Sequence, residues 1–245
     1  MQKTTTLPKQ FTYKKVKNLL SPGNTNAKTA KNEIETYILY LAPANTIGSH
    51  NVCPFASPGC KASCLYSAGR GAFSNVQNAR INKTKFWAYD RQAFYFQLHS
   101  ELLQLDFLAS AQDKKIAIRL NGTSDIDHLD LLNRYTGHNW LTSKSLLFYD
   151  YTKNINVYKK YLGTNYKLTF SMSETNFDQV KDVLDMGGNV AAVFARDLPA
   201  KFMGFKVIDG DLTDLRYFDP KNVIIGLKAK GKAKKDTSGF VITKY

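Results

Sequence analysis

The chain has 245 residues and a mass of 27.6 kDa, with 43% hydrophobic and 22% charged residues. This composition is typical of a globular protein with a sizeable core, in one domain or two. No apolar run approaches the roughly 18 residues that a membrane span requires, and the start MQKTTTLPKQ lacks the apolar stretch of a signal peptide. We therefore expect neither a membrane protein nor a secreted one, but a cytoplasmic protein.

The net charge of +14 is concentrated at the two ends of the chain. Residues 1–32 hold seven lysines and no acidic residue, whereas residues 221–245 hold seven lysines and one acid, Asp236. The ends thus contribute +7 and +6, which leaves about +1 for the rest. Such ends either keep a protein soluble or bind the phosphates of a nucleotide or nucleic acid. We interpret 1–32 as a basic N-terminal arm and 33–245 as a single domain ending in a lysine-rich segment.

From residue 33 onward, short apolar runs alternate with helical segments. The predicted strands are Tyr37–Leu41, Lys115–Leu120, Ser145–Tyr149, Tyr166–Phe170, Val190–Phe194, Phe205–Ile208 and Val223–Ile225. The predicted helices cover 73–110, 126–136, 153–162 and 176–186. Apolar strands that are followed by helices indicate a buried parallel sheet with crossover connections. The predicted fold is α/β, a full or partial parallel (β/α) barrel resembling a TIM barrel, with a doubly wound sheet as the alternative.

Three cysteines follow the first predicted strand, in the segment NVCPFASPGCKASCLYSAGRG. They are Cys53, Cys60 and Cys64, and an odd number in a cytoplasmic protein argues against a disulfide framework. The spacing C-x6-C-x3-C, with two prolines and a glycine turning the chain, brings soft thiolates into one small volume, as a metal site requires. We favour a 4Fe–4S cluster with three cysteine ligands and one open iron. Zinc with His50 as the fourth ligand and reduced structural or redox-active thiols are the alternatives.

In a parallel barrel, functional side chains gather at the carboxyl ends of the strands. The candidate catalytic residues in these positions are Asn121, Ser124, Asp125, Ser171, Glu174, Arg196, Asp209 and Asp211. The candidates for binding an anionic ligand are Lys28, in the turn-rich segment SPGNTNAK, and Lys228, Lys230 and Lys232, in the segment KAKGKAKK. The plainer alternatives are that polar loop residues cap the next helix and that a lysine run is a solvated segment.

Four stretches of the sequence resemble a known family. They are LLSPGNTNAKTAKN, NVCPFASPGCKASCLYSAGRG, NGTSD and VIDGDLTDLRYFDPKNVIIGLKAKGKAK. Together they resemble the phage and plasmid gene product 88 family, whose members in phages of Gram-positive bacteria also carry replication-protein names. The resemblance covers nearly the whole chain. It implies a phage or plasmid protein that works in the host cell cytoplasm, with a replication-associated role.

The cysteine loop is also similar, more loosely, to that of radical S-adenosylmethionine enzymes. Their partial barrels carry a three-cysteine loop after the first strand and a cluster with one open iron, so the similarity implies S-adenosylmethionine as a ligand of that iron. Two features differ. The spacing C-x6-C-x3-C replaces the usual C-x3-C-x2-C, and NGTSD stands where a glycine-rich strand end would bind methionine.

Two functions from different classes follow from these observations. The first is an iron–sulfur enzyme that acts on a nucleotide or a nucleic-acid-related substrate, with the strand-end residues orienting it. The alternative is a non-catalytic nucleic-acid-binding replication or accessory protein, in which zinc or a cluster merely staples a loop. The polar residues at the strand ends favour the enzyme.

Overall fold

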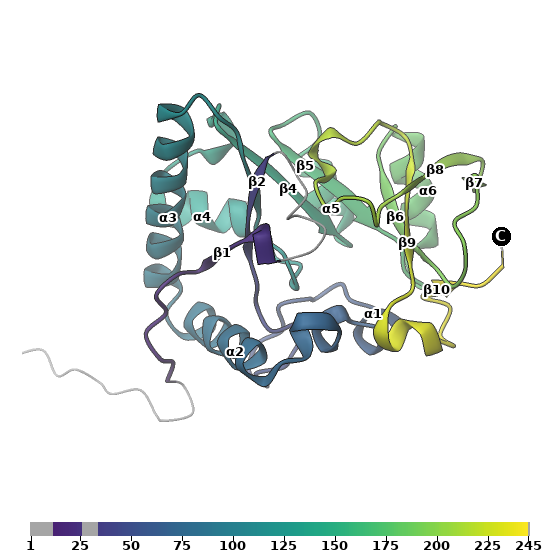
Figure 1. The fold of residues 1–245 in the computed structure, drawn as a ribbon, viewed down its shortest axis with the longest axis horizontal. Helices are drawn as coiled ribbons and strands as arrows, with labels where there is room; N and C mark the ends of the chain where they lie inside the picture. The colour runs from purple at the N-terminus through teal and green to yellow at the C-terminus, as the bar shows by residue number, and fades with distance from the viewer. Residues whose placement is uncertain (1–11, 26–33, 245) are drawn as a thin grey trace, which may run out of the picture.

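Strands and helices alternate along most of the chain, which a computed structural model describes for residues 12–25 and 34–244 (Figure 1). The strands are β1 (Leu20–Pro22), β2 (Glu35–Leu39), β3 (Ile116–Arg119), β4 (Leu146–Thr152), β5 (Tyr166–Ser171), β6 (Val190–Phe194), β7 (Lys201–Phe202), β8 (Phe205–Asp209), β9 (Ile224–Lys228) and β10 (Val241–Ile242). The α-helices are α1 (Pro58–Ala62), α2 (Ser74–Tyr89), α3 (Arg91–Ala111), α4 (His128–Thr136), α5 (Ile155–Lys160) and α6 (Phe177–Asp185). The 3-10 helices are η2 (Gly23–Thr25), η3 (Leu65–Ser67), η4 (Gly69–Ala72), η5 (Trp140–Thr142), η6 (Arg216–Phe218) and η7 (Gly231–Lys235).

Seven strands form a continuous parallel series in the described residues, in the order β2-β3-β4-β5-β6-β9-β8. β1 and β7 pair antiparallel with β2 and β8 at the two edges. β10 is parallel to β6 and pairs with Val193 and Phe194, beyond Ser171, where β5 ends. The last strand therefore replaces β5 as the neighbour of β6 at the carboxyl end of the sheet. Over the described ranges, the sheet does not close on itself.

The predicted α/β class is confirmed, and each of the seven predicted strands overlaps an observed one. The helix predicted for 73–110 is instead two helices, α2 and α3, separated at Asp90. The φ of −145° and ψ of 66° at Asp90 lie outside the helical range, and its carboxylate accepts a hydrogen bond from the Ala93 amide as an N-cap. Figure 1 shows the result: α3 stands beside the sheet, while α2 lies along its lower end.

One face of the sheet is covered by helices. α3 and α4 pack over β2, β3 and β4, and α5 and α6 pack over β5 and β6. On α3, the fully buried Phe94, Leu98 and Leu102 recur every four residues, so they form one apolar stripe that joins the same core as Ile118 and Phe148. Each such side chain contributes about 2 kcal/mol by leaving water. In the described part of the chain, no helix has both the length and the apolar character that a membrane span demands.

The opposite face of the sheet is covered by the strap, the segment of residues 211–222 that joins β8 to β9. Its helix η6 packs on β4 and β5, and the strap passes in front of the sheet in Figure 1. Arg119 on β3 donates from Nη1 to the carboxylate of Asp214 on the strap, and its guanidinium lies 4.8 Å from the centre of the Tyr151 ring. This buried ion pair fastens the strap to the sheet.

Asp150 on β4 is a second buried carboxylate beside Arg119. Its carboxylate lies 3.6 Å from Nε of Arg119 and accepts hydrogen bonds from two backbone amides after β3 and from the hydroxyl of Tyr166. Burial raises the pKa of Asp150 to about 7, although the guanidinium and the three donors oppose that shift. Arg119 thus lies between two buried carboxylates, one from the sheet and one from the strap.

Residues 12–25, which the sequence assigns to a basic arm, pack against the domain. The carboxylate of Glu101 on α3 accepts hydrogen bonds from the amides of Leu19 and Leu20, at 2.7 and 2.8 Å. β1 then extends the sheet by pairing with β2. The predicted ligand-binding residue Lys28 lies outside the described residues.

The Arg119–Asp214 ion pair leads us to a prediction about stability. Replacing Asp214 with Asn leaves a buried guanidinium with one carboxylate partner fewer, so we expect a loss of about 3 kcal/mol in the free energy of unfolding. Urea denaturation measures it, and the exposed Asp182→Asn on α6 is the control, with an expected change below about 0.5 kcal/mol. Equal midpoints for the two variants would show that the pair does not hold the strap.

Candidate functional site

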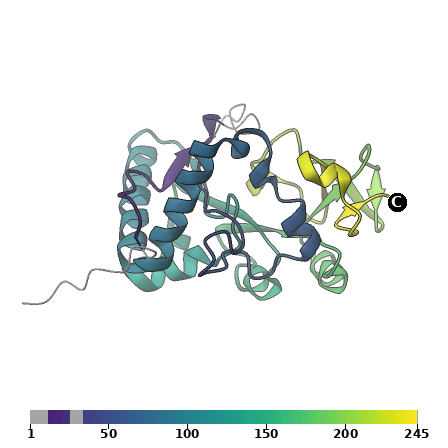
Figure 2. The same cartoon turned by 90° about the horizontal axis from the view of Figure 1, so that it is seen from below.

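Residues 43–73, which we call the cysteine segment, cross the carboxyl ends of the parallel strands. The segment leaves the end of β2, and the amide of Asp125, after β3, donates to the carbonyl of Val52 at 2.8 Å. Farther along, Gly59 donates to the side chain of Glu174, after β5. Figure 2 looks onto this end of the sheet and shows the segment running across it toward the C-terminal residues. The cysteines therefore lie at the end of the sheet where the sequence predicts the functional residues.

Cys53 is held in place by backbone groups on both sides. Its Sγ accepts a hydrogen bond from the amide of Ala44 at 3.3 Å and donates to the carbonyl of Thr123 at 3.7 Å. Burial raises the pKa of Cys53 to about 12, and the nearby thiols of Cys64 and Cys60 add to that shift. All three cysteines are half-buried and free of disulfides. The segment thus brings the three thiols into one neighbourhood.

Cys60 lies on α1, a helix of five residues whose start is firmly tied. Ser57 is its N-cap and accepts from the Cys60 amide at 3.1 Å, and Pro58 occupies the first turn, where a missing N–H does no harm. The carboxylate of Glu174 accepts from the Ser57 hydroxyl and from the Gly59 amide, both at 2.7 Å. The predicted site residue Glu174 therefore fastens the cysteine segment to the end of β5.

Two cations lie near Cys64. Arg80 on α2 stacks on the rings of Tyr40 and Tyr66, with its guanidinium carbon 4.4 and 5.8 Å from their centres. Burial raises the pKa of Cys64, while a hydrogen bond from the Tyr66 amide and the charges of Arg80 and Lys153 lower it. These cations favour the thiolate form of Cys64, the form that binds a metal.

The described residues contain no three His, Cys, Asp or Glu side chains close enough together to hold a single metal ion. The ring of His50 packs edge-on against Trp87 and Tyr89, and its Nδ1 lies 3.1 Å from the hydroxyl of Ser49. Burial and the charge of Arg91 lower the pKa of His50. The side chain of His50, the predicted fourth ligand of a zinc site, thus packs against α2.

The predicted site residues of the NGTSD loop bond to one another and to β4. Asn121 Oδ1 accepts from the hydroxyl of Ser124 at 2.8 Å and from the amide of Ile126 at 3.0 Å. The carboxylate of Asp125 accepts from the hydroxyl of Thr152 at 2.7 Å and from the next amide at 2.9 Å. These three residues shape the loop that supports Cys53, and their hydrogen bonds account for their polarity.

The strand ends beyond β6 form a second group. Asp211 accepts from the amide of Lys228 and pairs with Nζ of Lys230 at 2.8 Å, while Asp209 accepts from the amide of Asp211. Lys228 pairs with Asp197 at 3.1 Å. Carboxylates therefore already contact two of the lysines predicted to bind an anion.

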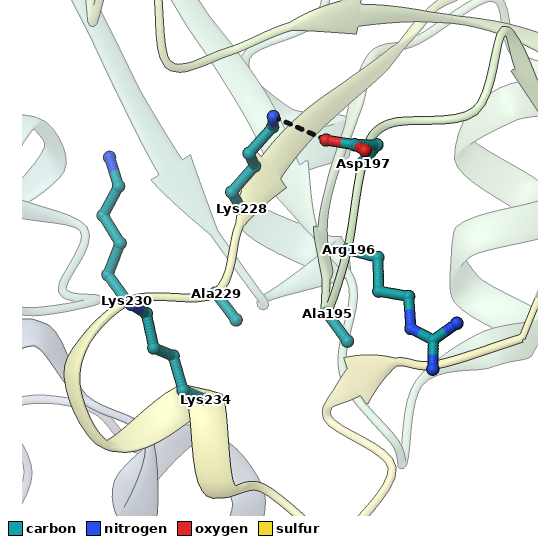
Figure 3. A pocket seen from close by; sticks show the side chains of 7 residues that line it. All are labelled: Ala195, Arg196, Asp197, Lys228, Ala229, Lys230 and Lys234. Atoms are coloured by element: carbon teal, nitrogen blue, oxygen red, sulfur yellow. Dashed lines mark hydrogen bonds and ion pairs between the residues drawn. The ribbon is translucent and has the colours of Figure 1, made fainter.

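An open pocket lies between the ends of β6 and β9 (Figure 3). Its lining residues are Ala195, Arg196, Asp197, Lys228, Ala229, Lys230 and Lys234. Among the described residues, Arg196 and Lys234 form no ion pair, so the pocket keeps an excess of positive charge. Arg196 lines the same pocket as Lys228 and Lys230, although its side chain points away from theirs (Figure 3). Ser171 lies at the end of β5, and Lys232 is exposed on η7.

The C-terminal residues lie on the cysteine segment. η7 packs against η3, and a Cβ added at Gly231 would lie 3.1 Å from Cβ of Ala68. A Cβ at Gly59 would lie 2.2 Å from Oγ of Ser238 and 2.7 Å from Cβ of Phe240. Any side chain at position 59 would clash at these distances, so only glycine fits here without a shift of the C-terminal residues.

Four residues around Cys64 were not among the candidates predicted from the sequence: Tyr40, Tyr66, Arg80 and Lys153. Lys153 directly follows β4, so the criterion of strand-end position applies to it. Tyr40 directly follows β2, but it lies inside the predicted strand Tyr37–Leu41, because β2 ends two residues earlier than predicted. Arg80 lies inside a helix, and no local signal marks it.

A family model described as Gene product 88 matches residues 15–244. The chain belongs to the gene product 88 family. The match includes the cysteine segment, the strap and the lysine-rich residues after β9, so the family resemblance predicted from the sequence is confirmed. No curated protein and no solved structure matches the chain.

The close approach at Gly59 makes a second prediction. Gly59→Ala places a methyl group against Ser238 and Phe240, so we expect the C-terminal residues to lift away from α1. The amides of Val241 and Ile242 should then exchange with deuterium at least tenfold faster, while those of β3 keep their wild-type rates. Unchanged exchange at β10 would mean that the C-terminal residues do not depend on this contact.

Proposed function

We propose that this protein binds an iron–sulfur cluster through Cys53, Cys60 and Cys64 and uses it as an enzyme. The observation that carries the proposal is the gathering of three half-buried thiols, none of them in a disulfide, at the carboxyl end of a parallel sheet. Thiolates are the ligands that such clusters require, and the carboxyl ends of parallel strands are where α/β enzymes hold their substrates.

A single zinc ion and a cubane cluster impose different spacings on their ligand sulfurs. A tetrahedral zinc ion would hold its ligand sulfurs roughly 4 Å apart, given a Zn–S bond of about 2.3 Å. A cubane cluster has its irons between the sulfurs and holds them farther apart. The three thiols lie within electrostatic reach of one another, and the described residues hold no set of three side chains arranged around a single ion. With three thiolates as its ligands, a 4Fe–4S cluster keeps one iron open.

Residues around the thiols suit the charge of such a group. Arg80 and Lys153 offset the negative charge of bound thiolates beside Cys64. Glu174 keeps the segment closed over the strand ends through Ser57 and Gly59. When bound, the cluster supplies an iron that acts as a Lewis acid or as an electron donor.

The substrate that this site suits best carries phosphate, as a nucleotide or a nucleic acid does. Arg196, Lys228, Lys230 and Lys234 line the pocket beyond the cysteine segment and would attract that charge. We also interpret the mostly sequential order of the parallel strands as a partial (β/α) barrel. That interpretation makes S-adenosylmethionine a candidate ligand of the open iron, with the NGTSD loop in place of a glycine-rich strand end.

The alternative function is a nucleic-acid-binding replication or accessory protein with a structural metal. The observation that favours it is the packing of the lysine-rich η7 on the cysteine segment, because a metal there would mainly fix the surface. The metal distinguishes the zinc form of this alternative from the cluster enzyme, since a zinc ion has no labile sulfide and no redox activity.

Anaerobic loading tests the cluster. We expect about four irons and four labile sulfides per chain after incubation with iron and sulfide, with a broad absorption near 400 nm. Each of Cys53→Ser, Cys60→Ser and Cys64→Ser should lose most of the iron, whereas His50→Ala should keep it, because His50 packs on α2. One tightly bound zinc with no sulfide, lost in His50→Ala, would replace the proposal with the Cys3His alternative.

Arg80 makes a prediction about redox potential. The reduced cluster carries one more negative charge, so the nearby guanidinium stabilises it, and Arg80→Gln should lower the potential by tens of millivolts. Lys85→Gln removes the same charge from the same helix and should shift the potential less. Titration followed by electron paramagnetic resonance measures both, and equal shifts would show that Arg80 has no special relation to the site.

A further inference from the structure

Two basic segments that are far apart in the sequence meet on one face of the molecule. Residues 36–89 contain five lysines and arginines and no acidic residue, and residues 229–235 contain four lysines and no acidic residue. η7 packs against η3, and Figures 1 and 2 both show the C-terminal η7 beside the cysteine segment. We call this surface, formed by residues 53–80 and 229–235, the basic face.

The cations of the basic face differ in how they are engaged. Lys230 is paired with Asp211. Among the described residues, exposed Lys61, Arg70, Lys232, Lys234 and Lys235 form no ion pair. Their charge is therefore available to an anionic partner. These free cations come from both segments, so a partner that binds all of them must extend across the contact between η3 and η7.

The same face exposes large apolar side chains. Phe55, Leu65 and Phe73 are 49%, 56% and 59% exposed, and all three belong to the cysteine segment. Leu65 begins η3, which η7 contacts, and Phe73 precedes the first residue of α2. Exposed aromatic rings among unpaired cations are the combination that binds unpaired bases, because every base offers a flat face for stacking while its phosphates attract the cations.

We propose that the basic face binds single-stranded nucleic acid, with Phe55 and Phe73 stacking on bases and Lys232, Lys234 and Lys235 contacting phosphates. The proposal rests on the proposed function only in making this strand the substrate presented to the cluster. A duplex fits less well, since its bases are stacked on one another and leave the rings without partners. A free nucleotide fits less well too, because it is too short to reach free cations on both segments.

Binding is measured by the fluorescence anisotropy of a labelled 20-nucleotide strand, as DNA and as RNA, and of a duplex of the same length. We expect the protein to bind a single strand at least tenfold more tightly than the duplex. The triple variant K232Q/K234Q/K235Q should weaken binding at least tenfold and lower the slope of log affinity against log salt by about two, since each lysine–phosphate pair contributes about 0.7. The variant F55A/F73A should weaken binding about tenfold with an unchanged salt slope.

Matched variants control for total charge and apolar area. K114Q/K115Q/K144Q removes three exposed lysines near the amino ends of β3 and β4, and F107A removes a ring that is 73% exposed on α3. Neither should change the affinity by more than twofold. Equal losses in these controls, equal affinity for duplex and single strand, or an unaltered affinity in F55A/F73A would each overturn the proposal.

Cluster content is measured on the same samples by iron, sulfide and absorption. Specific binding by a protein that takes up no cluster would support the basic face and refute the iron–sulfur enzyme. A loaded protein that binds no strand would refute the basic face and leave the cluster intact. The substitutions lie on exposed side chains, so each variant should keep the wild-type circular dichroism spectrum.

Discussion

The site is held together by the carboxylate of Glu174, which joins two parts of the chain more than one hundred residues apart. Its oxygens accept hydrogen bonds from Ser57 and Gly59 at the start of α1. Glu174 itself lies in the loop after β5, which ends at Ser171. A short helix has little stability of its own, so α1 depends on this anchor for its position. Without it, the start of α1 would lose both hydrogen bonds that join it to the residues after β5.

Among the described residues, charged side chains are paired in the core under the strap but are partly unpaired at the carboxyl end of the sheet. Under the strap, Arg119 is enclosed between Asp150 and Asp214, and burial makes each of these groups depend on the others. At the carboxyl end of the sheet, Lys228 and Lys230 pair with carboxylates, but in the described part of the chain Arg80 on α2, Arg196 and Lys234 form no ion pair. The first arrangement fixes a connection between strands, whereas the second leaves positive charge available to a partner.

The strands were predictable because burial on both faces makes them almost wholly apolar, a pattern visible within five or six residues. The break at Asp90 was not, since neither glycine nor proline marks it and the residues on either side are good helix formers. β10 has only two residues and becomes a strand only by pairing with β6. The rule that residues after parallel strands share one end of the sheet correctly predicted the location of Glu174, Arg196 and the cysteines. It could not reveal that Asn121 and Asp125 satisfy their hydrogen bonds within the loops.

β10 also has a consequence for the order of events during synthesis. Val241 and Ile242 leave the ribosome long after the cysteines, yet they pair with β6 beside the cysteine segment. Until then, the C-terminal residues cannot pack on the cysteine segment, so η3 and α1 are more open to solvent in the growing chain than in the folded one. The timing of this last pairing therefore separates an open stage of folding from the finished site.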